Sequence, residues 1–178
     1  DRNLRISYSK TTARTTFKEI TAAQIYYPIT ETYFVWNPYC NPTYINNFDL
    51  RYESYSDGNQ IFAISTFYKQ FIDPIEITAF DANQPSVFIV RNNEEASVYG
   101  IELEYRKDIL NNDNHKLSLN LNTSVIQSIQ TMSDAEYQGR LISNPDKEID
   151  DSRELQGQSP YLINLGLVYN LFEKNIEI

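Results

Sequence analysis

Residue types that carry catalysis are scarce in this chain. His115 is the only histidine and Cys40 the only cysteine, so neither a disulfide framework nor a cysteine zinc site is available. The sequence has no Gly-x-Ser-x-Gly elbow and no glycine-rich phosphate loop. We expect His115, beside a short polar turn, to be solvated, and Cys40 to be a free thiol in a Pro/Asn segment. The sequence therefore predicts neither an enzyme nor a cofactor.

Oxygen ligands for a cation are a second candidate chemistry. An acidic segment before Pro160 offers carboxylates in close order, and calcium prefers such ligands. The segment lacks the spacing and the glycine of an EF-hand loop, so solvated charge is the favoured interpretation and a metal site the alternative. The weak metal candidates are Asp146, Glu148, Asp150 and Asp151, with Glu154 nearby.

Aromatic side chains gather between Thr12 and Thr43, a stretch that is also rich in Thr, Pro and Asn. Pro and Asn mark turns, so we predict a long loop here, with room for a short helix near 17–24. Exposed rings can stack on a sugar or on the aromatic group of a chelate. Packing of the loops on each other is the alternative. The candidate ligand contacts are Tyr26, Tyr27, Tyr33, Phe34, Trp36 and Tyr39, with Arg153 from a later loop.

A two-residue alternation of apolar and polar side chains defines the elements that must position these loops. In 117–125, Leu, Thr and Val occupy one face, and Ser and Asn occupy the other. This period is typical of β-strands with one apolar face. Asp57-Gly58 adds a tight hairpin signal, and a small hairpin is expected from 76–80 and 87–91. The predicted strands are 3–11, 44–53, 60–71, 96–107, 116–125 and 161–172.

The connections between these strands are alternately long and short. If neighbouring strands are antiparallel, every long connection lies at one end of the sheet, as in outer-membrane barrels with short periplasmic turns and long extracellular loops. Strands of ten to twelve residues also match a bilayer. We therefore predict an all-β fold, an antiparallel transmembrane β-barrel segment. Tyrosines expected at the two membrane interfaces are Tyr8, Tyr44, Tyr55, Tyr68, Tyr105 and Tyr161.

Charge restricts the partners. The net charge is −9, and the 15 basic residues are scattered, which argues against nucleic acid and favours neutral, cationic or metal-chelating partners. No run approaches the ~20 apolar residues of a spanning helix. The polar faces of the strands carry charges that lipid would not tolerate. The residues expected to face the lumen are Arg5, Asp49, Arg51, Glu53, Lys69, Glu102, Glu104 and Arg106.

Seven short motifs span nearly the whole chain in order: 4–11 followed by Ala13-Arg14, then Asn37-Pro38, 42–53, 67–69, 74–76, 100–105 and 157–161. Together they resemble the TonB-dependent outer-membrane receptors, particularly the Bacteroidota type. The chain departs from the family at Thr15, where Pro is usual, at Trp36, where Gly is usual, and at 39–41, where a leucine-containing stretch is usual. These departures all lie in the first long loop and affect its conformation and its ligand, not the strand order.

The resemblance implies a 22-stranded barrel in the Gram-negative outer membrane with an N-terminal plug, importing an iron chelate, cobalamin or a glycan. The implied partners are TonB, through an N-terminal segment, the plug of the same protein, outer-membrane lipid and a surface lipoprotein lid. Residues 1–178 are expected to form an interior part of a single barrel domain, without the plug and the closing strands. A soluble β-rich adhesin or glycan-binding module is the alternative.

Overall fold

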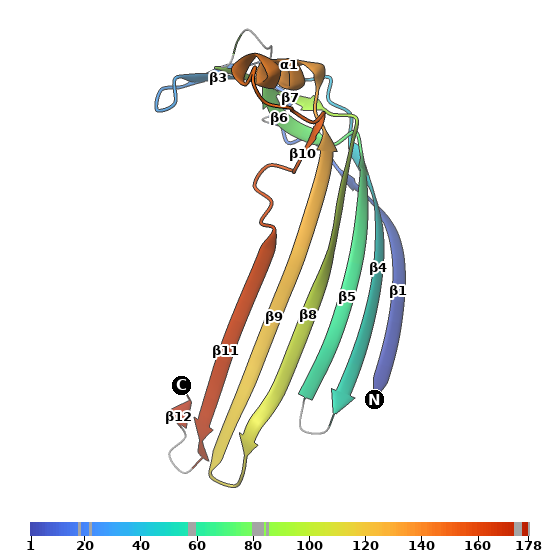
Figure 1. Cartoon of the computed structure of the whole chain (residues 1–178), viewed down its shortest axis with the longest axis vertical. Helices are drawn as coiled ribbons and strands as arrows, with labels where there is room; N and C mark the ends of the chain where they lie inside the picture. Colours follow the sequence, from blue (N-terminus) through green and yellow to red (C-terminus); the bar gives the residue numbers. More distant parts are fainter. Residues whose placement is uncertain are drawn as a thin grey trace.

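Six long antiparallel strands form one curved sheet. The computed structural model describes residues 1–178 except 18, 22, 57–59, 80–83, 85, 173–175 and 178. The sheet runs in the order β1-β4-β5-β8-β9-β11-β12, and β10 pairs with β9 (Figure 1). Its strands are β1 (Arg2–Ala13), β4 (Thr43–Ser56), β5 (Gln60–Ile72), β8 (Glu95–Asn111), β9 (His115–Thr131), β10 (Ser152–Arg153), β11 (Tyr161–Leu171) and β12 (Ile176–Glu177).

All six predicted strands are therefore confirmed, and so is the placement of the connections. The connections 14–42, 73–94 and 132–160 lie at one end of the long strands, and the short turns lie at the other (Figure 1). The Asp57-Gly58 turn lies outside the described residues. No described helix has the length and apolar character needed to cross a membrane.

A second, four-stranded sheet covers the end with the long connections. It runs β2 (Gln24–Tyr27), β3 (Thr32–Val35), β7 (Val87–Asn92), β6 (Ile75–Ala79), and β3 pairs in parallel with β7. The predicted hairpin of the second connection is thus confirmed as β6 and β7. The helix expected near 17–24 is wrong, because the described residues of this stretch form turns and Gln24 begins β2.

The third connection holds a helix that the periodicity did not predict, α1 (Asp134–Ser143). Ser133 caps it, since the side chain accepts a hydrogen bond from the backbone N–H of Glu136. Ser133 and Glu136 have the spacing of a capping box, which is the sequence signal that could have found the helix. None of its described residues is buried, so the helix lies on the surface of the third connection.

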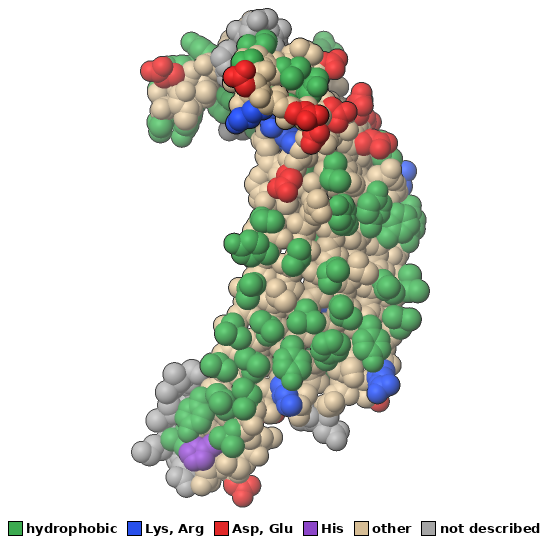
Figure 2. All heavy atoms as spheres, in the orientation of Figure 1, with side chains coloured by type: hydrophobic (Ala, Val, Ile, Leu, Met, Phe, Trp, Pro, Cys, Tyr) green, Lys and Arg blue, Asp and Glu red, His purple; other side chains and the backbone are tan. Residues whose placement is uncertain are grey.

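Strand register gives the large sheet two distinct faces. Tyr8, Phe48, Tyr68 and Tyr99 pair in one row across four strands, with ring centroids 4.9 Å apart for Tyr8–Phe48 and 6.3 Å apart for Phe48–Tyr68. Figure 2 shows hydrophobic side chains spread along this face. Of the described strand residues on it, the charged ones lie near strand ends, at Arg2, Lys10, Glu95 and Lys107.

The opposite, polar face holds an ion-pair network. The Arg51 guanidinium lies 2.6 Å from the Glu53 carboxylate and 2.8 Å from the Glu104 carboxylate, and Arg5 lies 3.1 Å from Glu53. Tyr55 also lies on this face by register, so its predicted place at the membrane interface is wrong. All the residues expected to face the lumen share the polar face: Arg5, Asp49, Arg51, Glu53, Lys69, Glu102, Glu104 and Arg106.

A glycine on the polar face allows two strands to pack closely around an aromatic ring. A Cβ added at Gly100 would lie 2.7 Å from the Val125 carbonyl oxygen and 2.8 Å from the Phe67 ring. Gly166, in contrast, has its nearest such contact at 3.8 Å. The Phe67 ring therefore fills the space that the missing side chain leaves, a device that stabilises barrel strands.

Gly100→Ala is expected to destabilise the full-length receptor by about 1–3 kcal/mol, because the added methyl group meets backbone that cannot move aside. Gly166→Ala is the matched control and should have little effect. The measurement is the temperature at which each variant loses its folded gel mobility. Equal temperatures for the two variants would contradict the packing at Gly100.

Lysine placed on either face tests the face assignment. Leu165→Lys puts a charge on the apolar face and should cost about 2–4 kcal/mol near the bilayer midplane, whereas Asn120→Lys on the polar face should be mild. Urea unfolding of the full-length receptor in lipid vesicles measures both. Equal costs would show that the apolar face is not the lipid-facing one.

Candidate functional site

The three long connections fold back onto the polar face of the strand ends. Ala96, Val98 and Gln130 lie on that face with 3%, 7% and 0% of their surface exposed, whereas Ile129 on the apolar face is 43% exposed. The Leu155 backbone N–H donates a hydrogen bond to the Ser128 hydroxyl at 3.0 Å. The loops therefore cover the polar face of the sheet at this end and leave the apolar face bare.

A buried arginine joins the second connection to the third. Arg153 lies 2.7 Å from the Glu76 carboxylate of β6 and 2.7 Å from the Glu136 carboxylate of α1, with 7%, 13% and 11% of the three side chains exposed. Burial alone would lower the pKa of the Arg153 guanidinium, but its hydrogen bonds to Glu136 and Glu76 outweigh burial and raise that pKa. The guanidinium therefore keeps its charge and holds β6, α1 and β10 together.

This arrangement gives Arg153 an anchoring role that the sequence did not reveal. Its donors are engaged by the two carboxylates and by the Glu154 carbonyl oxygen. A direct contact between Arg153 and a ligand stays a prediction. Its partners come from elements far apart in the sequence, so no local motif could have identified the cluster.

The six aromatic candidates do not form a single cluster. Tyr26 and Tyr33 face each other across β2 and β3 with ring centroids 4.8 Å apart. On the alternate face, Phe34 stacks on Phe88 at 5.7 Å and on Trp36 at 6.4 Å. Tyr27 is 45% exposed in β2, and Tyr39 is 87% exposed outside the strands. Phe34 therefore packs against β7, whereas the Tyr26–Tyr33 pair on one face of the hairpin and Tyr27 on the other are accessible.

The acidic candidates are not assembled into a metal site. Asp146, Glu148, Asp150 and Asp151 are all exposed. Among the described residues, no three His, Cys, Asp or Glu side chains converge in a way that could hold a metal ion. The four exposed carboxylates are thus solvated in the described structure, and calcium binding by this segment stays the weaker alternative.

Cys40 and His115, the single cysteine and the single histidine, each contact another residue of the chain. The Cys40 thiol lies 3.5 Å from the Val90 carbonyl oxygen, and burial, with a smaller effect of Glu19, raises its pKa, which disfavours the reactive thiolate. His115 is not simply solvated as expected, because its Nδ1 lies 2.6 Å from the Tyr169 hydroxyl and its ring stacks on that side chain.

A cavity that the sequence did not indicate lies under the connections. It has a volume of about 320 Å³, and its wall combines apolar and charged side chains in the manner of a ligand pocket. Because five separate segments contribute to it, only the folded chain reveals it. Its lining includes Arg14, Glu19, Ile45, Phe71, Ile75 and Leu155.

Arg153→Met should loosen both connections, because removing one partner of a buried ion pair leaves carboxylates uncompensated at a cost of about 3 kcal/mol. Amide hydrogen exchange of the full-length receptor is expected to quicken in both β6 and α1. Arg140→Met is the control, since Arg140 forms a half-exposed i,i+4 pair with the same Glu136, worth about 0.3–0.5 kcal/mol. Unchanged exchange in the Arg153 variant would contradict the anchoring role.

Comparison with known proteins agrees with this architecture. The family model described as TonB dependent receptor-like, beta-barrel, matches residues 1–175, and no curated protein sequence matches the chain. The siderophore receptor PirA of Pseudomonas aeruginosa is similar with a TM-score of 0.53 and 15% identity, over 75% of this chain and 25% of that one. A mutant of the ferric enterobactin receptor PfeA of the same organism is similar with a TM-score of 0.53 and 14% identity, over 96% of this chain and 30% of that one.

At these identities the solved receptors show a shared fold, and the chain spans only about a quarter to a third of their length. The family model covers nearly all of the chain, which sets aside the alternative of a soluble adhesin or glycan-binding module. The chain therefore belongs to the TonB-dependent receptor-like β-barrel family of outer-membrane transport proteins.

Proposed function

We propose that this chain is the interior part of a barrel that imports a scarce nutrient, an iron chelate, cobalamin or a glycan, with energy delivered through TonB. One observation carries the proposal. The sheet has an apolar face, a charged polar face and every long connection at the same end. A barrel wall needs this combination, because lipid contacts one side and the transport path lies on the other.

The polar face would contact the plug of the same protein. Its network of Arg5, Arg51, Glu53 and Glu104 keeps these charges paired in the described chain. Glu102 lines a second cavity of about 200 Å³ beside Arg51 and Glu104, which leaves acceptor atoms for a plug residue. TonB would engage an N-terminal segment of the whole protein, and the Bacteroidota-type motifs further suggest a surface lipoprotein above the loops.

The nutrient would first meet the end of the sheet that carries the three long connections, here called the loop end. The aromatic hairpin and the cavity beneath the connections offer ring faces, apolar surface and a few charges at this end. Of the similar structures, PirA is a siderophore receptor and PfeA a ferric enterobactin receptor. The likeness of this chain to those receptors is one of fold, so the cargo of this chain depends on its own loop residues.

Growth of deletion strains tests the proposal. A strain lacking the whole receptor should lose growth on one limiting source among ferric chelates, cobalamin and glycans, and a strain lacking TonB should lose growth on the same source. Re-expression of the full-length receptor should restore growth only when TonB is present. Restored growth without TonB would contradict TonB-dependent import.

A further inference from the structure

We propose that the hairpin of β2 and β3 is a stacking platform for an uncharged, polyhydroxylated, ring-bearing ligand, which is the chemistry of a sugar chain. This inference rests on the proposed function, since it names the class of nutrient that the loop end receives. Three observations carry it: an exposed tyrosine pair, an opposite face that already anchors the hairpin, and the charge of the surrounding connections.

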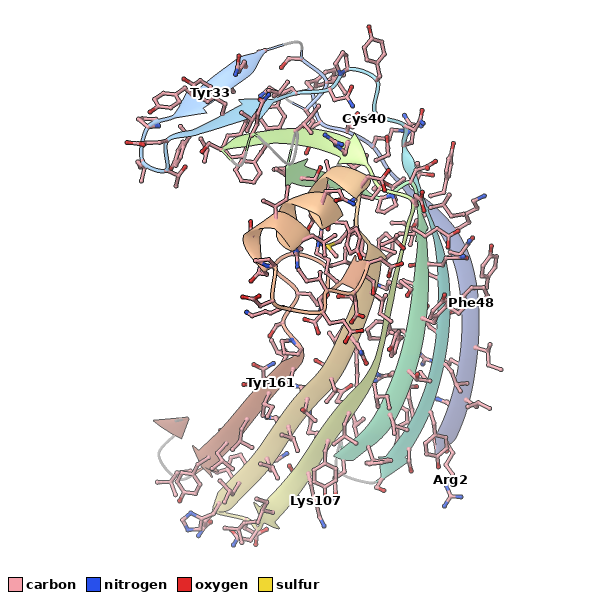
Figure 3. The ribbon with its side chains drawn as sticks, turned by 45° about the horizontal axis from the view of Figure 1, so that its top comes forward. Arg2, Tyr33, Cys40, Phe48, Lys107 and Tyr161 are labelled. Atoms are coloured by element: carbon pink, nitrogen blue, oxygen red, sulfur yellow. The ribbon has the colours of Figure 1, made fainter. Side chains whose placement is uncertain are left out.

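The tyrosine pair presents ring faces and hydroxyl groups to solvent. Tyr26 and Tyr33 are directly paired across the hairpin, their rings lie 4.8 Å apart at an interplanar angle of 39°, and they are 48% and 41% exposed. Figure 3 shows Tyr33 on the small sheet, beyond the ends of the long strands. Such rings offer an apolar face on which a sugar ring can stack, and their hydroxyl groups add a hydrogen-bonding group at the edge.

The tyrosine pair is not needed to hold the hairpin in place, because other side chains anchor it. Phe34 is paired with Phe88 in the parallel ladder of β3 and β7, and their rings stack at 5.7 Å. Trp36 extends this contact at 6.4 Å from Phe34. Side chains alternate between the faces of a strand, so Phe34 anchors one face while Tyr33 remains accessible on the other.

The charge of the connections distinguishes between a neutral sugar and an anionic chelate as the ligand, although both can carry rings. The connections 14–42, 73–94 and 132–160 contain 13 Asp or Glu residues and six Lys or Arg residues, a net charge of −7 out of −9 for the chain. Figure 2 shows acidic side chains gathered at this end. Two of the basic residues, Arg140 and Arg153, are already ion-paired with Glu136 and Glu76.

This field repels a multiply charged anion during approach. The same carboxylates are good acceptors for the hydroxyl groups of an uncharged sugar. The aromatic pair and the acidic surroundings therefore both favour an uncharged sugar. An anionic tris-catecholate would stack on the rings, but the negative charge would weaken its binding.

The test is binding by the purified full-length receptor in detergent. The probes are an array of neutral oligosaccharides and, as the anionic aromatic probe, ferric enterobactin. At least one neutral oligosaccharide should bind better than ferric enterobactin. Tyr26→Ala and Tyr33→Ala should each weaken that binding about tenfold, and Tyr33→Phe should retain most of it. The control is Phe17→Ala, at an exposed ring of the first connection outside the hairpin, which should change binding less than twofold.

Binding of ferric enterobactin in preference to every neutral oligosaccharide would overturn the ligand class. Sugar binding that is unaffected by both alanine variants, shown to be folded by their heat-dependent gel mobility, would overturn the role of the hairpin. Either result leaves the proposed function standing. Import of the bound sugar without TonB would instead contradict the proposed function and leave the inference intact.

Discussion

Inside the hydrocarbon of a membrane, each backbone N–H or C=O group without a partner costs several kcal/mol, so a strand can cross only if both of its edges are paired. The ladders from β1 to β11 meet this requirement for the interior strands of the arc. Because the pairing is antiparallel and in regular register apart from a bulge between Asp108 and Leu110, side chains alternate between two faces. The aromatic row of one face, the ion-paired charges of the other and the position of every long connection all follow from this one constraint.

The loop end obeys different physics, because water replaces lipid there. The connections are held by contacts between segments far apart in the chain: the parallel pairing of β3 with β7, and the Arg153 ion pairs with Glu76 and Glu136. A buried charge of this kind is stable only while both carboxylates remain close. The second and third connections are therefore expected to behave as one unit, above a cavity on the polar face.

The sequence was most informative where structure is local. A two-residue period identifies a strand without knowledge of its neighbours, which is why six strands, their faces and the ends of the sheet were predicted. A position near a strand end does not determine the face of a side chain: Tyr55 pairs with Ile61, which pairs with Arg106 on the polar face. α1 is a short surface helix without a buried residue, and its local signal is the capping spacing of Ser133 and Glu136. The partners of Arg153 and the β3–β7 pairing are long-range and leave no local pattern.

The central claim is that the apolar face of the sheet contacts lipid and the polar face does not. Single spin labels placed in turn along residues 117–125 of the full-length receptor in vesicles test it directly, through relaxation by oxygen, which partitions into lipid, and by a water-soluble nickel chelate. We predict a two-residue period, with strong oxygen relaxation at Leu119 and Leu121 and weak relaxation at Asn120 and Asn122. Oxygen relaxation without alternation, or a maximum at the asparagines, would contradict the account.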